Sequence, residues 1–500
     1  MPRSIDARFL NFPFDRLADA ALQTAKDLGA TYADFRFEVH RAQSIFVKDH
    51  DLQSLSNGEG VGFGVRVIID GSRGYASDVR LAADAVAAAV RRAIDLAKQF
   101  RGLNSEPVEL ADEPDYTDTY VSAYEVNPFD VGDDEKIAFV RAITEKVLSG
   151  GKVDHVDMAL LQVEESKFFA NMTGSRITQQ RIRVSADFEA TKVNKQTGAF
   201  ETMASTSPPV GRGWEFFSNG GYDYMADAER IPALLEEKIA SPSIEPGTYD
   251  LVIHPSNLWL TIHESIGHST ELDRVLGFEA TLAGTSFAKL EQLGELKIGS
   301  DVMNVTGDRV TDDGVATVGY DDEGVKAQRW DIIKDGTLVG YQLNRQMARK
   351  LGMRSNGCAY ADSPANVPIQ RMPNVTLQPG PGPISLDDLI GGVERGIYIV
   401  GNKSWSIDQQ RYNFQFTGQQ FWEIKGGKLA GQLKDVAYQG NTIDFWNSME
   451  AVGGPETFIL FGTFNCGKGL PGQGAPAGHG CPAALFRGIK ILNTVAEGAR

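Results

Sequence analysis

The segment 263–268, with the sequence H-E-S-I-G-H, carries two of the seven histidines of this 500-residue chain. The neutral imidazole nitrogens of His263 and His268 are suitable ligands for Zn²⁺. A carboxylate beside the metal, here Glu264, can accept the proton of a water molecule that the metal has activated. These residue types together indicate the chemistry of a zinc hydrolase.

The two histidines are five residues apart, whereas the common metalloprotease pattern H-E-x-x-H places its ligands at i and i+4. Five steps along a straight α-helix rotate by about 500°, which leaves the two rings about 140° apart and unable to bind one ion. A single π-type bulge would return position i+5 to the same face, and Gly267 suits that distortion. We therefore expect a bulged helix over about 258–268, capped by Ser256 or Asn257. Without the bulge, the two histidines would be unrelated.

A third ligand would complete a catalytic zinc site, and Cys466 is the first candidate. It lies in the glycine-rich segment N-C-G-K-G, where a thiolate could bind the ion and Lys468 could favour the ionised form. The segment lacks the pattern G-x-x-x-x-G-K-[ST], which argues against nucleotide binding. On residue type alone Cys466 could also be an ordinary buried thiol. Four rivals for the third position remain open: Glu271, Asp273, His479 and Cys481.

The composition of the chain limits the partners and the cellular compartment that can be expected for it. A net charge of −17 argues against a nucleic-acid backbone or an anionic membrane surface as the main partner. Three cysteines give no disulfide framework, the first residues lack the apolar core of a signal peptide, and no run approaches 18 apolar residues. These features predict a cytoplasmic protein that binds neither nucleic acid nor membrane.

The first half of the chain alternates between helical and strand patterns. Amphipathic helices are expected over 15–28, 80–100, 135–148 and 226–240. Strands are expected over 35–39, 44–47, 60–69, 74–77, 159–163, 167–171 and 176–189. Residues 101–130 have the composition of a loop, and Pro242, Pro246 and Gly247 mark a boundary. We therefore expect a domain break near 241–247.

Strand signals dominate the second half. A short strand at 251–253 precedes the histidine helix, and hairpin turns are expected at 334–337 and 425–428. The aromatic residues that alternate through 411–424 favour a sheet core, whereas nine glycines and three prolines in 453–480 favour an irregular surface segment. The predicted fold class is α+β. An N-terminal domain of sheet and amphipathic helices (15–241) would precede a β-rich C-terminal domain (247–497) that carries the H-E-x-x-x-H helix.

Several separate segments together resemble the TldD/PmbA family of zinc metallopeptidases, also described as modulators of DNA gyrase. They are G-V-G-F-G-V-R at 60–66, H-E-S-I-G-H at 263–268, G-Y-D-D-E-G at 319–324, D-G at 335–336, R-M-P-N at 371–374 and C-G-K at 466–468. Spaced matches in the right order are more specific than any single motif. The similarity extends over about 15–490.

The resemblance implies roles that spacing does not settle. In the TldD branch, the two histidines and the cysteine of the C-terminal glycine-rich segment bind the metal, which makes His263, His268 and Cys466 the ligands of Zn²⁺ and Glu264 the catalytic base. The PmbA (TldE) branch lacks the metal motif and resembles a partner subunit. The resemblance therefore also implies a dimer, either a homodimer or a heterodimer with a PmbA/TldE-like paralogue.

The leading expectation is a zinc-dependent metallopeptidase that acts on unfolded or extended peptides, which could add as a strand to an exposed sheet edge. One alternative is a regulatory or scaffold subunit whose closed, structural metal site has His479 or Cys481 as fourth ligand. Another is a different zinc hydrolase, such as an amidase. The sequence does not identify the substrate-binding residues. The candidates for a donor that stabilises the oxyanion formed during hydrolysis are Lys468 and a backbone N–H of the glycine-rich segment.

Overall fold

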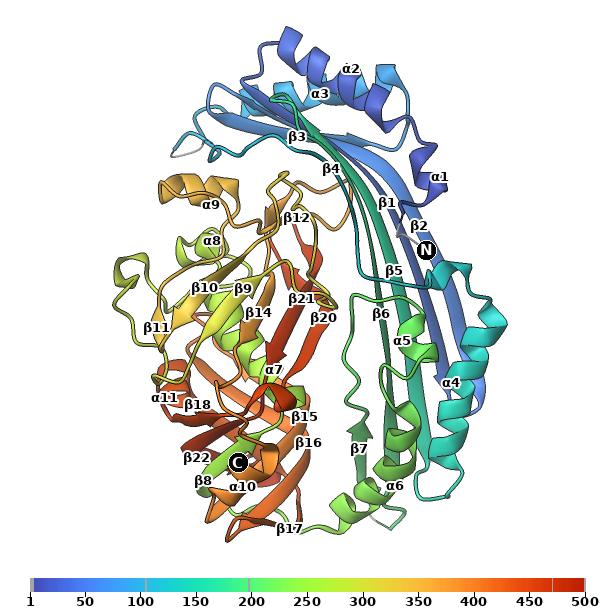
Figure 1. Cartoon of the computed structure of the whole chain (residues 1–500), viewed down its shortest axis with the longest axis vertical. Helices are drawn as coiled ribbons and strands as arrows, with labels where there is room; N and C mark the ends of the chain where they lie inside the picture. Colours follow the sequence, from blue (N-terminus) through green and yellow to red (C-terminus); the bar gives the residue numbers. More distant parts are fainter. Residues whose placement is uncertain (1–3, 104–105, 197, 470, 499–500) are drawn as a thin grey trace.

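The computed structural model describes residues 4–103, 106–196, 198–469 and 471–498. A long curved sheet with helices on its outer side forms the N-terminal half, and a β-rich C-terminal half lies against its inner side (Figure 1). This arrangement confirms the predicted α+β class. None of the described helices has the length and hydrophobicity needed to cross a lipid bilayer.

One seven-stranded sheet organises the N-terminal half, in the order β3-β2-β1-β5-β6-β4 with β7 paired to β6. Its strands are β1 (Tyr32–Lys48), β2 (Asp51–Ile69), β3 (Ser72–Asp78), β4 (Thr117–Val121), β5 (His155–Asn171), β6 (Arg176–Val193) and β7 (Phe200–Ala204). Its helices are α1 (Ala7–Leu10), α2 (Phe14–Asp27), α3 (Ala83–Gln99), α4 (Asp133–Leu148), α5 (Glu215–Ser218) and α6 (Tyr224–Ala240). Apolar residues of α2 and α3 pack on one end of the sheet, and those of α4 and α6 on the other.

The long strands differ from the shorter segments that their apolar patterns predict. The segments expected at 35–39 and 44–47 are both parts of β1, and those at 159–163 and 167–171 are both parts of β5. Polar side chains interrupt the pattern between them, and some are buried and paired, as when Gln43 accepts a hydrogen bond from Gln162 at 2.9 Å. The expected loop at 101–130 contains a strand, β4, which pairs in parallel with β6.

The C-terminal half contains two larger sheets, ordered β11-β10-β9-β14-β21-β20 and β15-β8-β22-β18-β16-β17, with β19 paired to β22. The first sheet consists of β9 (Val305–Asp308), β10 (Arg329–Lys334), β11 (Thr337–Leu338), β14 (Asn374–Leu377), β20 (Ile459–Lys468) and β21 (Gln473–Cys481). The second consists of β8 (Gly247–Ile253), β15 (Arg395–Ile407), β16 (Asn413–Lys425), β17 (Lys428–Leu433), β18 (Val436–Asn441), β19 (Met449–Val452) and β22 (Ala484–Asn493).

A two-stranded ribbon and six short helices complete this half. They are β12 (Ala359–Tyr360), β13 (Ile369–Gln370), α7 (Pro255–Ile262), α8 (Leu272–Val275), α9 (Arg345–Lys350), α10 (Leu386–Gly391), α11 (Thr442–Asn447) and α12 (Thr494–Gly498). The aromatic side chains of Phe414, Phe416 and Phe421 are buried in the largest apolar cluster, as their alternation predicts.

The prediction of an irregular segment at 453–480 is wrong, because most of it forms the antiparallel hairpin β20–β21. Its glycines are needed for close packing inside the sheet. A Cβ atom on Gly478 would lie 1.9 Å from Oδ1 of Asn374, and one on Gly480 would lie 2.3 Å from the ring of Phe458. Glycine here permits close approach of neighbouring groups rather than irregular backbone.

The two halves meet through a buried charge network around the segment 319–324. Asp322 accepts a hydrogen bond from Nζ of Lys167 on β5 at 2.8 Å. Glu323 accepts one from Nη1 of Arg66 on β2 at 2.5 Å, and Arg66 also pairs with Asp34 of β1. We call this set of five residues the interface network. The sequence alone assigned no role to the motif G-Y-D-D-E-G. In the structure, its residues Asp322 and Glu323 help to join the two halves.

Candidate metal centre

The histidine segment forms the end of a helix that packs between the two C-terminal sheets. α7 contacts β15 of one sheet and β20 and β21 of the other. It continues into a π-helical turn, His263–Gly267, and then a 3₁₀ turn, His268–Thr270. The expected π-type bulge is thus confirmed, and the ring centroids of His263 and His268 lie 4.7 Å apart.

The start of this helix differs from the prediction. The capping residue is His254, whose Nδ1 accepts a hydrogen bond from the backbone N–H of Ser256 at 3.2 Å. Pro255 occupies the first helical position, where its missing N–H costs no hydrogen bond. The hydroxyl of Ser256 instead lies 2.8 Å from Nδ1 of His254 and accepts the backbone N–H of Gly401 at 2.8 Å, so neither Ser256 nor Asn257 caps α7.

Local contacts explain why the helix widens here. A Cβ atom on Gly267 would lie 2.6 Å from Sδ of Met372, so glycine lets Met372 pack closely against the helix at this point. Hydroxyl groups also bond back to the helix carbonyls: Ser265 donates to Thr261 O at 2.5 Å, and Ser269 donates to Ser265 O at 2.7 Å. These hydroxyls supply partners for carbonyl groups where the backbone ladder changes from i+4 to i+5.

Cys466 reaches the histidines from strand β20. The register between β20 and β21 shifts between Thr463 and Cys466, which marks a bulge beside the thiol. Nη1 of Arg371 donates to the carbonyl of Gln473 at 2.9 Å, and its Nη2 donates to the carbonyl of Cys466. The buried guanidinium of Arg371 therefore ties the two strands of the hairpin together next to the thiol.

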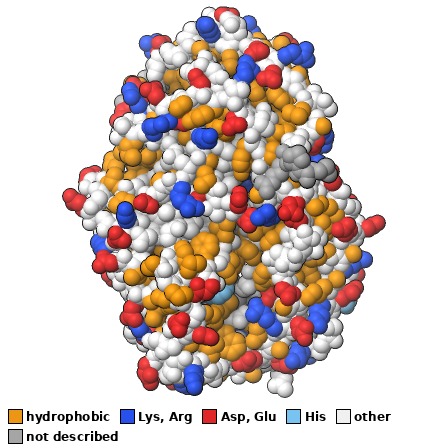
Figure 2. All heavy atoms as spheres, viewed as in Figure 1, with side chains coloured by type: hydrophobic (Ala, Val, Ile, Leu, Met, Phe, Trp, Pro, Cys, Tyr) orange, Lys and Arg blue, Asp and Glu red, His pale blue; other side chains and the backbone are white. Residues whose placement is uncertain are grey.

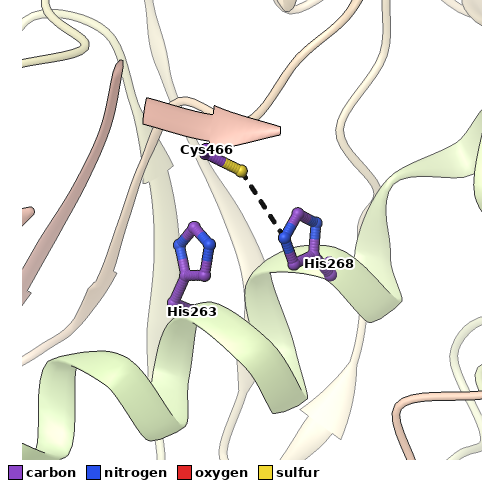
Figure 3. A group of neighbouring side chains, drawn as sticks. All are labelled: His263, His268 and Cys466. Atoms are coloured by element: carbon purple, nitrogen blue, oxygen red, sulfur yellow. Dashed lines mark hydrogen bonds between the residues drawn. The ribbon is translucent and has the colours of Figure 1, made fainter. Parts of the chain in front are cut away.

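The two imidazoles and the thiol converge on one region (Figure 3). One donor atom from each of His263, His268 and Cys466 lies within 4.8 Å of the others, and Sγ of Cys466 is 3.5 Å from Nε2 of His268. In a tetrahedral zinc site with Zn–N of about 2.05 Å and Zn–S of about 2.3 Å, a nitrogen and a sulfur ligand lie about 3.5 Å apart. The spacing of Cys466 and His268 and the N/N/S chemistry of the three buried side chains therefore fit zinc.

A chain of hydrogen bonds orients His263. Nδ1 of His479 lies 3.1 Å from the carbonyl of Val375, and because a carbonyl only accepts, this nitrogen carries the proton. Nε2 of His479 is then an acceptor, 2.7 Å from Nδ1 of His263, which must donate. The lone pair of His263 consequently lies on Nε2. His479, a rival for the third ligand, acts here as a partner that fixes the tautomer of a ligand candidate.

A carboxylate orients His268 in the same way. Oε2 of Glu271 lies 2.9 Å from Nδ1 of His268, which places the proton on Nδ1 and leaves Nε2 facing Cys466. Nζ of Lys468 donates to Oε1 of Glu271 at 2.9 Å and to Oδ1 of Asp273 at 2.8 Å. The structure thus places Glu271 and Asp273, two further rivals, in ion pairs behind the histidine. Lys468 pairs with them instead of facing the thiol.

The three cysteines differ in their electrostatic surroundings. Burial raises the pKa of Cys358 to about 12, and it also raises the pKa of Cys481, whose sulfur lies against the carbonyl of Pro255. Burial acts on Cys466 as well, but the neighbouring imidazole of His268 and the guanidinium of Arg371 outweigh it and lower its pKa. Cys466 is therefore the cysteine best suited to ionise and bind a metal.

Glu264 lies beside the cluster but outside the set of three converging donors. Its side chain is buried, and Oε2 accepts a hydrogen bond from Nη1 of Arg411 at 2.6 Å. Burial would raise the pKa of Glu264, but the imidazoles of His268 and His263 and the charge of Arg411 outweigh it and lower the pKa. A carboxylate that stays ionised next to the ligand cluster can serve as a base.

Two residues of this site were absent from the sequence-based assignment. Arg371 belongs to the segment R-M-P-N that resembles the family, so a signal existed, although it gave no role. Arg411 belongs to a polar turn with no recognisable pattern, and only the fold brings it to Glu264.

Comparison with protein families gives two matches. The model described as PmbA/TldA metallopeptidase C-terminal domain matches residues 246–493, and the model described as PmbA/TldA metallopeptidase domain 1 matches residues 33–97. Both belong to the same family, and together they cover most of the chain, including the whole candidate metal centre.

Relatives with assigned names match over nearly their full length. A protein of Methanothermobacter thermautotrophicus named "Metalloprotease" is 29% identical, with 93% of this chain and 96% of that protein covered. A "Zinc metalloprotease TldD homolog" of Saccharolobus solfataricus is 23% identical, with 94% and 98% covered. The names of these relatives are consistent with a metallopeptidase.

Solved structures share the fold. A protein of Thermotoga maritima, described as a modulator of a DNA gyrase, superposes with a TM-score of 0.75 at 16% identity and covers 96% of this chain and 100% of its own. TldE of Thermococcus kodakarensis gives a TM-score of 0.70 at 17% identity, with 95% and 99% covered. At these identities the likeness concerns the fold alone.

Proposed function

Because this chain belongs to the PmbA/TldD family, we propose that it is a zinc-dependent metallopeptidase that hydrolyses peptide bonds of unfolded or extended peptides. One observation carries the proposal: three buried N/N/S donors converge on one region, Cys466 and His268 at the spacing of zinc ligands, and a buried carboxylate lies next to them without joining them. That is the composition of a catalytic zinc centre, which keeps one position open.

In the proposed mechanism His263, His268 and Cys466 hold the ion. When bound, it would lower the pKa of a water molecule and polarise the carbonyl of the scissile bond. Glu264 accepts the proton of that water and passes it to the nitrogen of the leaving amine. His479 and Glu271 hold the two imidazoles in the tautomers that leave the lone pair of Nε2 available to a metal.

Two clefts support an extended substrate. A cleft of about 380 Å³ lies between β5, β6 and β7 of the N-terminal sheet and β20, and its wall includes Trp259, which packs against His263. A second cleft of about 470 Å³ lies on the other side of β20. Both are lined by Leu161, Phe464 and Asn465, and Asn465 directly precedes Cys466. A peptide lying along β20 would pass the metal centre.

Replacing Glu264 by glutamine tests the base. We expect Glu264→Gln to keep about one equivalent of zinc and to lose activity by 10²–10⁴-fold, the usual cost of removing a general base. Glu295→Gln, at an exposed position, is the matched control and should behave as wild type. Hydrolysis of a fluorogenic peptide library and elemental analysis measure both properties. Loss of zinc from Glu264→Gln would make Glu264 a ligand and refute its assigned role.

The same experiment separates the alternative, a regulatory or scaffold subunit with a structural metal. Such a protein would hold zinc in both wild type and Glu264→Gln and would cleave no peptide in either. His479 and Cys481, the expected fourth ligands of a closed site, are instead occupied by His263 and by the carbonyl of Pro255. This observation favours the open, catalytic site. An amidase would use the same residues and differs only in the substrates it cleaves.

We also propose that the active form is a dimer, either of two copies or with a PmbA/TldE-like paralogue. The likeness to a TldE fold supports this pairing, and two-fold assemblies are the commonest closed oligomers. Light scattering on the purified chain distinguishes a homodimer from a 54.4 kDa monomer. An active monomer would refute both forms of the dimer. Cytoplasmic residence and the domain division at 241–247 stay predictions.

A further inference from the structure

The turn between β15 and β16, residues 408–412, places a single arginine against the proposed base. Nη1 of Arg411 lies 2.6 Å from Oε2 of Glu264, and its side chain is largely buried. The turn is rigid because Asp408 accepts hydrogen bonds from the backbone N–H groups of Gln410, Tyr412 and Asn413 at 2.9–3.0 Å. The position of the guanidinium is therefore built into the fold.

Neighbouring segments fix the same turn from outside. The backbone N–H of Thr285 donates to the carbonyl of Gln409 at 2.8 Å, and that of Phe287 donates to the carbonyl of Gln410 at 2.9 Å. The hydroxyl of Thr442 donates to the carbonyl of Arg411 at 2.8 Å. Each of these contacts restrains the backbone that carries the guanidinium.

The backbone of Arg411 itself is unusual. Its φ of 62° lies in the left-handed region, which residues with a Cβ rarely adopt and which glycine adopts readily. A turn of this shape would be more stable with glycine or asparagine. The presence of arginine in a strained conformation directed at a candidate active site suggests that its side chain has a role there.

The hydrogen bonds of Arg411 leave donors free beside Glu264. Nη1 is engaged by Glu264, Nη2 is 3.5 Å from the carbonyl of Ala283, and Nε is buried with no partner among the residues that the structure describes. Arginine has five N–H donors in a rigid fork and stays protonated. An oxygen atom that approaches Glu264 would therefore meet preformed, charged donors.

The other cations near the centre are already committed. Lys468 pairs with Glu271 and Asp273. Arg274 pairs with Glu271, and Arg371 donates to two backbone carbonyls. Among these described cations, Arg411 is the one that contacts Glu264 directly.

We propose that Arg411 is a catalytic residue that binds the carbonyl oxygen of the scissile peptide bond and stabilises the negative charge that develops on it. The inference rests on the proposed peptidase function. Water oxygen bonds to the carbonyl carbon while the carbonyl π electrons move to oxygen and Glu264 takes the proton. The carbonyl then re-forms, the C–N bond breaks, and Glu264 returns the proton to nitrogen. Arg411 donates hydrogen bonds throughout and keeps its protons.

A ligand pair tests this role without relying on turnover. The first ligand is acetyl-Phe-Ψ[PO₂–CH₂]-Ala-Ala amide, whose phosphinyl oxygens imitate the oxyanion. The second has a reduced CH₂–NH link and no such oxygens. Both end in an amide, which removes any carboxylate that arginine could recognise. We expect Arg411→Ala to weaken binding of the phosphinic peptide to the zinc-loaded full chain by 10²–10³-fold, the typical loss for one oxyanion donor, and to leave the second ligand unaffected.

A second background separates direct contact from an effect through Glu264. If Arg411 acted only by orienting Glu264, Arg411→Ala would change nothing in a Glu264→Gln protein. We expect the same 10²–10³-fold loss of phosphinic-peptide affinity in that background. Arg349→Ala, which removes an exposed surface arginine, is the matched control and should bind both ligands as wild type does.

Folding and turnover complete the test. Arg411→Gly relieves the positive φ, which partly offsets the cost of leaving Glu264 without its cation. It should keep its zinc, remain folded by circular dichroism, and show reduced kcat with little change in KM. Added guanidinium should restore part of the kcat. Phosphinic-peptide affinity that is unchanged in Arg411→Ala would overturn the proposal for Arg411 alone. A wild-type protein that binds neither ligand and cleaves no peptide would instead overturn the proposed function.

Discussion

The metal centre and the interface network are both buried and polar, but their groups find partners in different ways. In the interface network, carboxylates face cations of the same chain, as Asp322 faces Lys167 and Glu323 faces Arg66. In the metal centre, two imidazole nitrogens and a thiol point at a common region, and His479 and Glu271 occupy only the far sides of the rings. Burial and polarity alone therefore do not mark a functional site. What distinguishes the candidate metal centre is that three metal-binding donor atoms converge on one region.

The charges on the molecular surface do not mark a functional site either. On the face shown in Figure 2, acidic and basic side chains are interspersed with apolar ones and form no continuous field of one sign. The chain carries a net charge of −17, yet the candidate metal centre and the interface network are both buried. Substitutions in the candidate metal centre should therefore change metal binding, and substitutions in the interface network should change stability.

Removing a ligand should have the largest effect. We expect His268→Ala and Cys466→Ser each to lose the stoichiometric zinc and all zinc-dependent activity, because two remaining ligands hold the ion poorly. Cys481→Ala should retain both, since its thiol lies against a backbone carbonyl away from the cluster. Elemental analysis after dialysis against a weak chelator measures the difference. Zinc loss in Cys481→Ala would return Cys481 to the ligand set.

Breaking the interface network should affect stability instead. Arg66→Met leaves Asp34 and Glu323 buried without their shared cation, and such a change typically costs about 3–5 kcal/mol. Chemical denaturation should show the loss, while zinc content stays at the wild-type level. If Arg66→Met instead lost its zinc and kept its stability, the proposed contrast between the two clusters would be wrong.

Acid should weaken the N-terminal sheet beside the interface network. Burial would raise the pKa of Glu38, but ion pairs with Arg36 and Lys167 outweigh it and lower the pKa from 4.5 to about 2. A depressed carboxylate pKa stabilises the fold above the unfolded value, so this contribution, about 3 kcal/mol, is present above pH 4.5 and lost as pH falls towards 2. Denaturation of the metal-free protein between pH 5 and 2 measures it. Glu38→Gln should show a flatter pH dependence.

The smallest effect should come from the partner behind a ligand. His479→Phe leaves Nδ1–H of His263 without its acceptor, and outer-shell changes of this kind typically lower metal affinity by 10–100-fold. Competition with a fluorescent chelator gives the affinity. An affinity equal to that of wild type would show that the hydrogen bond does not orient His263. Loss of zinc as complete as in His268→Ala would show that His479 is itself a ligand.

The sequence predicted the centre only in part, for physical reasons. The i+5 spacing of His263 and His268 was enough to predict the π turn, because helix rotation is a local property. The role of His479 depends on which way a proton points, and that is set by the carbonyl of Val375 on another strand. Arg411 reaches Glu264 only through the turn between β15 and β16. Side-chain partners from distant segments leave no local pattern.

The fold, too, was predicted from the sequence only where local patterns determine it. The α+β class and the long helices α2, α3, α4 and α6 follow from periodicity, but the strand pieces expected in β1 and β5 were too short, because polar residues interrupt the apolar pattern there. The glycines of β20–β21 favoured an irregular segment, since their need for close contacts with Asn374 and Phe458 is visible only once the sheets are assembled.

The separation of the proposed ligands along the chain has a consequence for biosynthesis. His268 and Cys466 are 198 residues apart in the sequence. Contacts between such distant segments form late, and the N-terminal part of a protein emerges first from the ribosome. A nascent chain thus carries Glu264 and both histidines long before it can complete the centre. If the proposed function is correct, we expect no peptidase activity until the segment around Cys466 has been synthesised and folded against the two histidines.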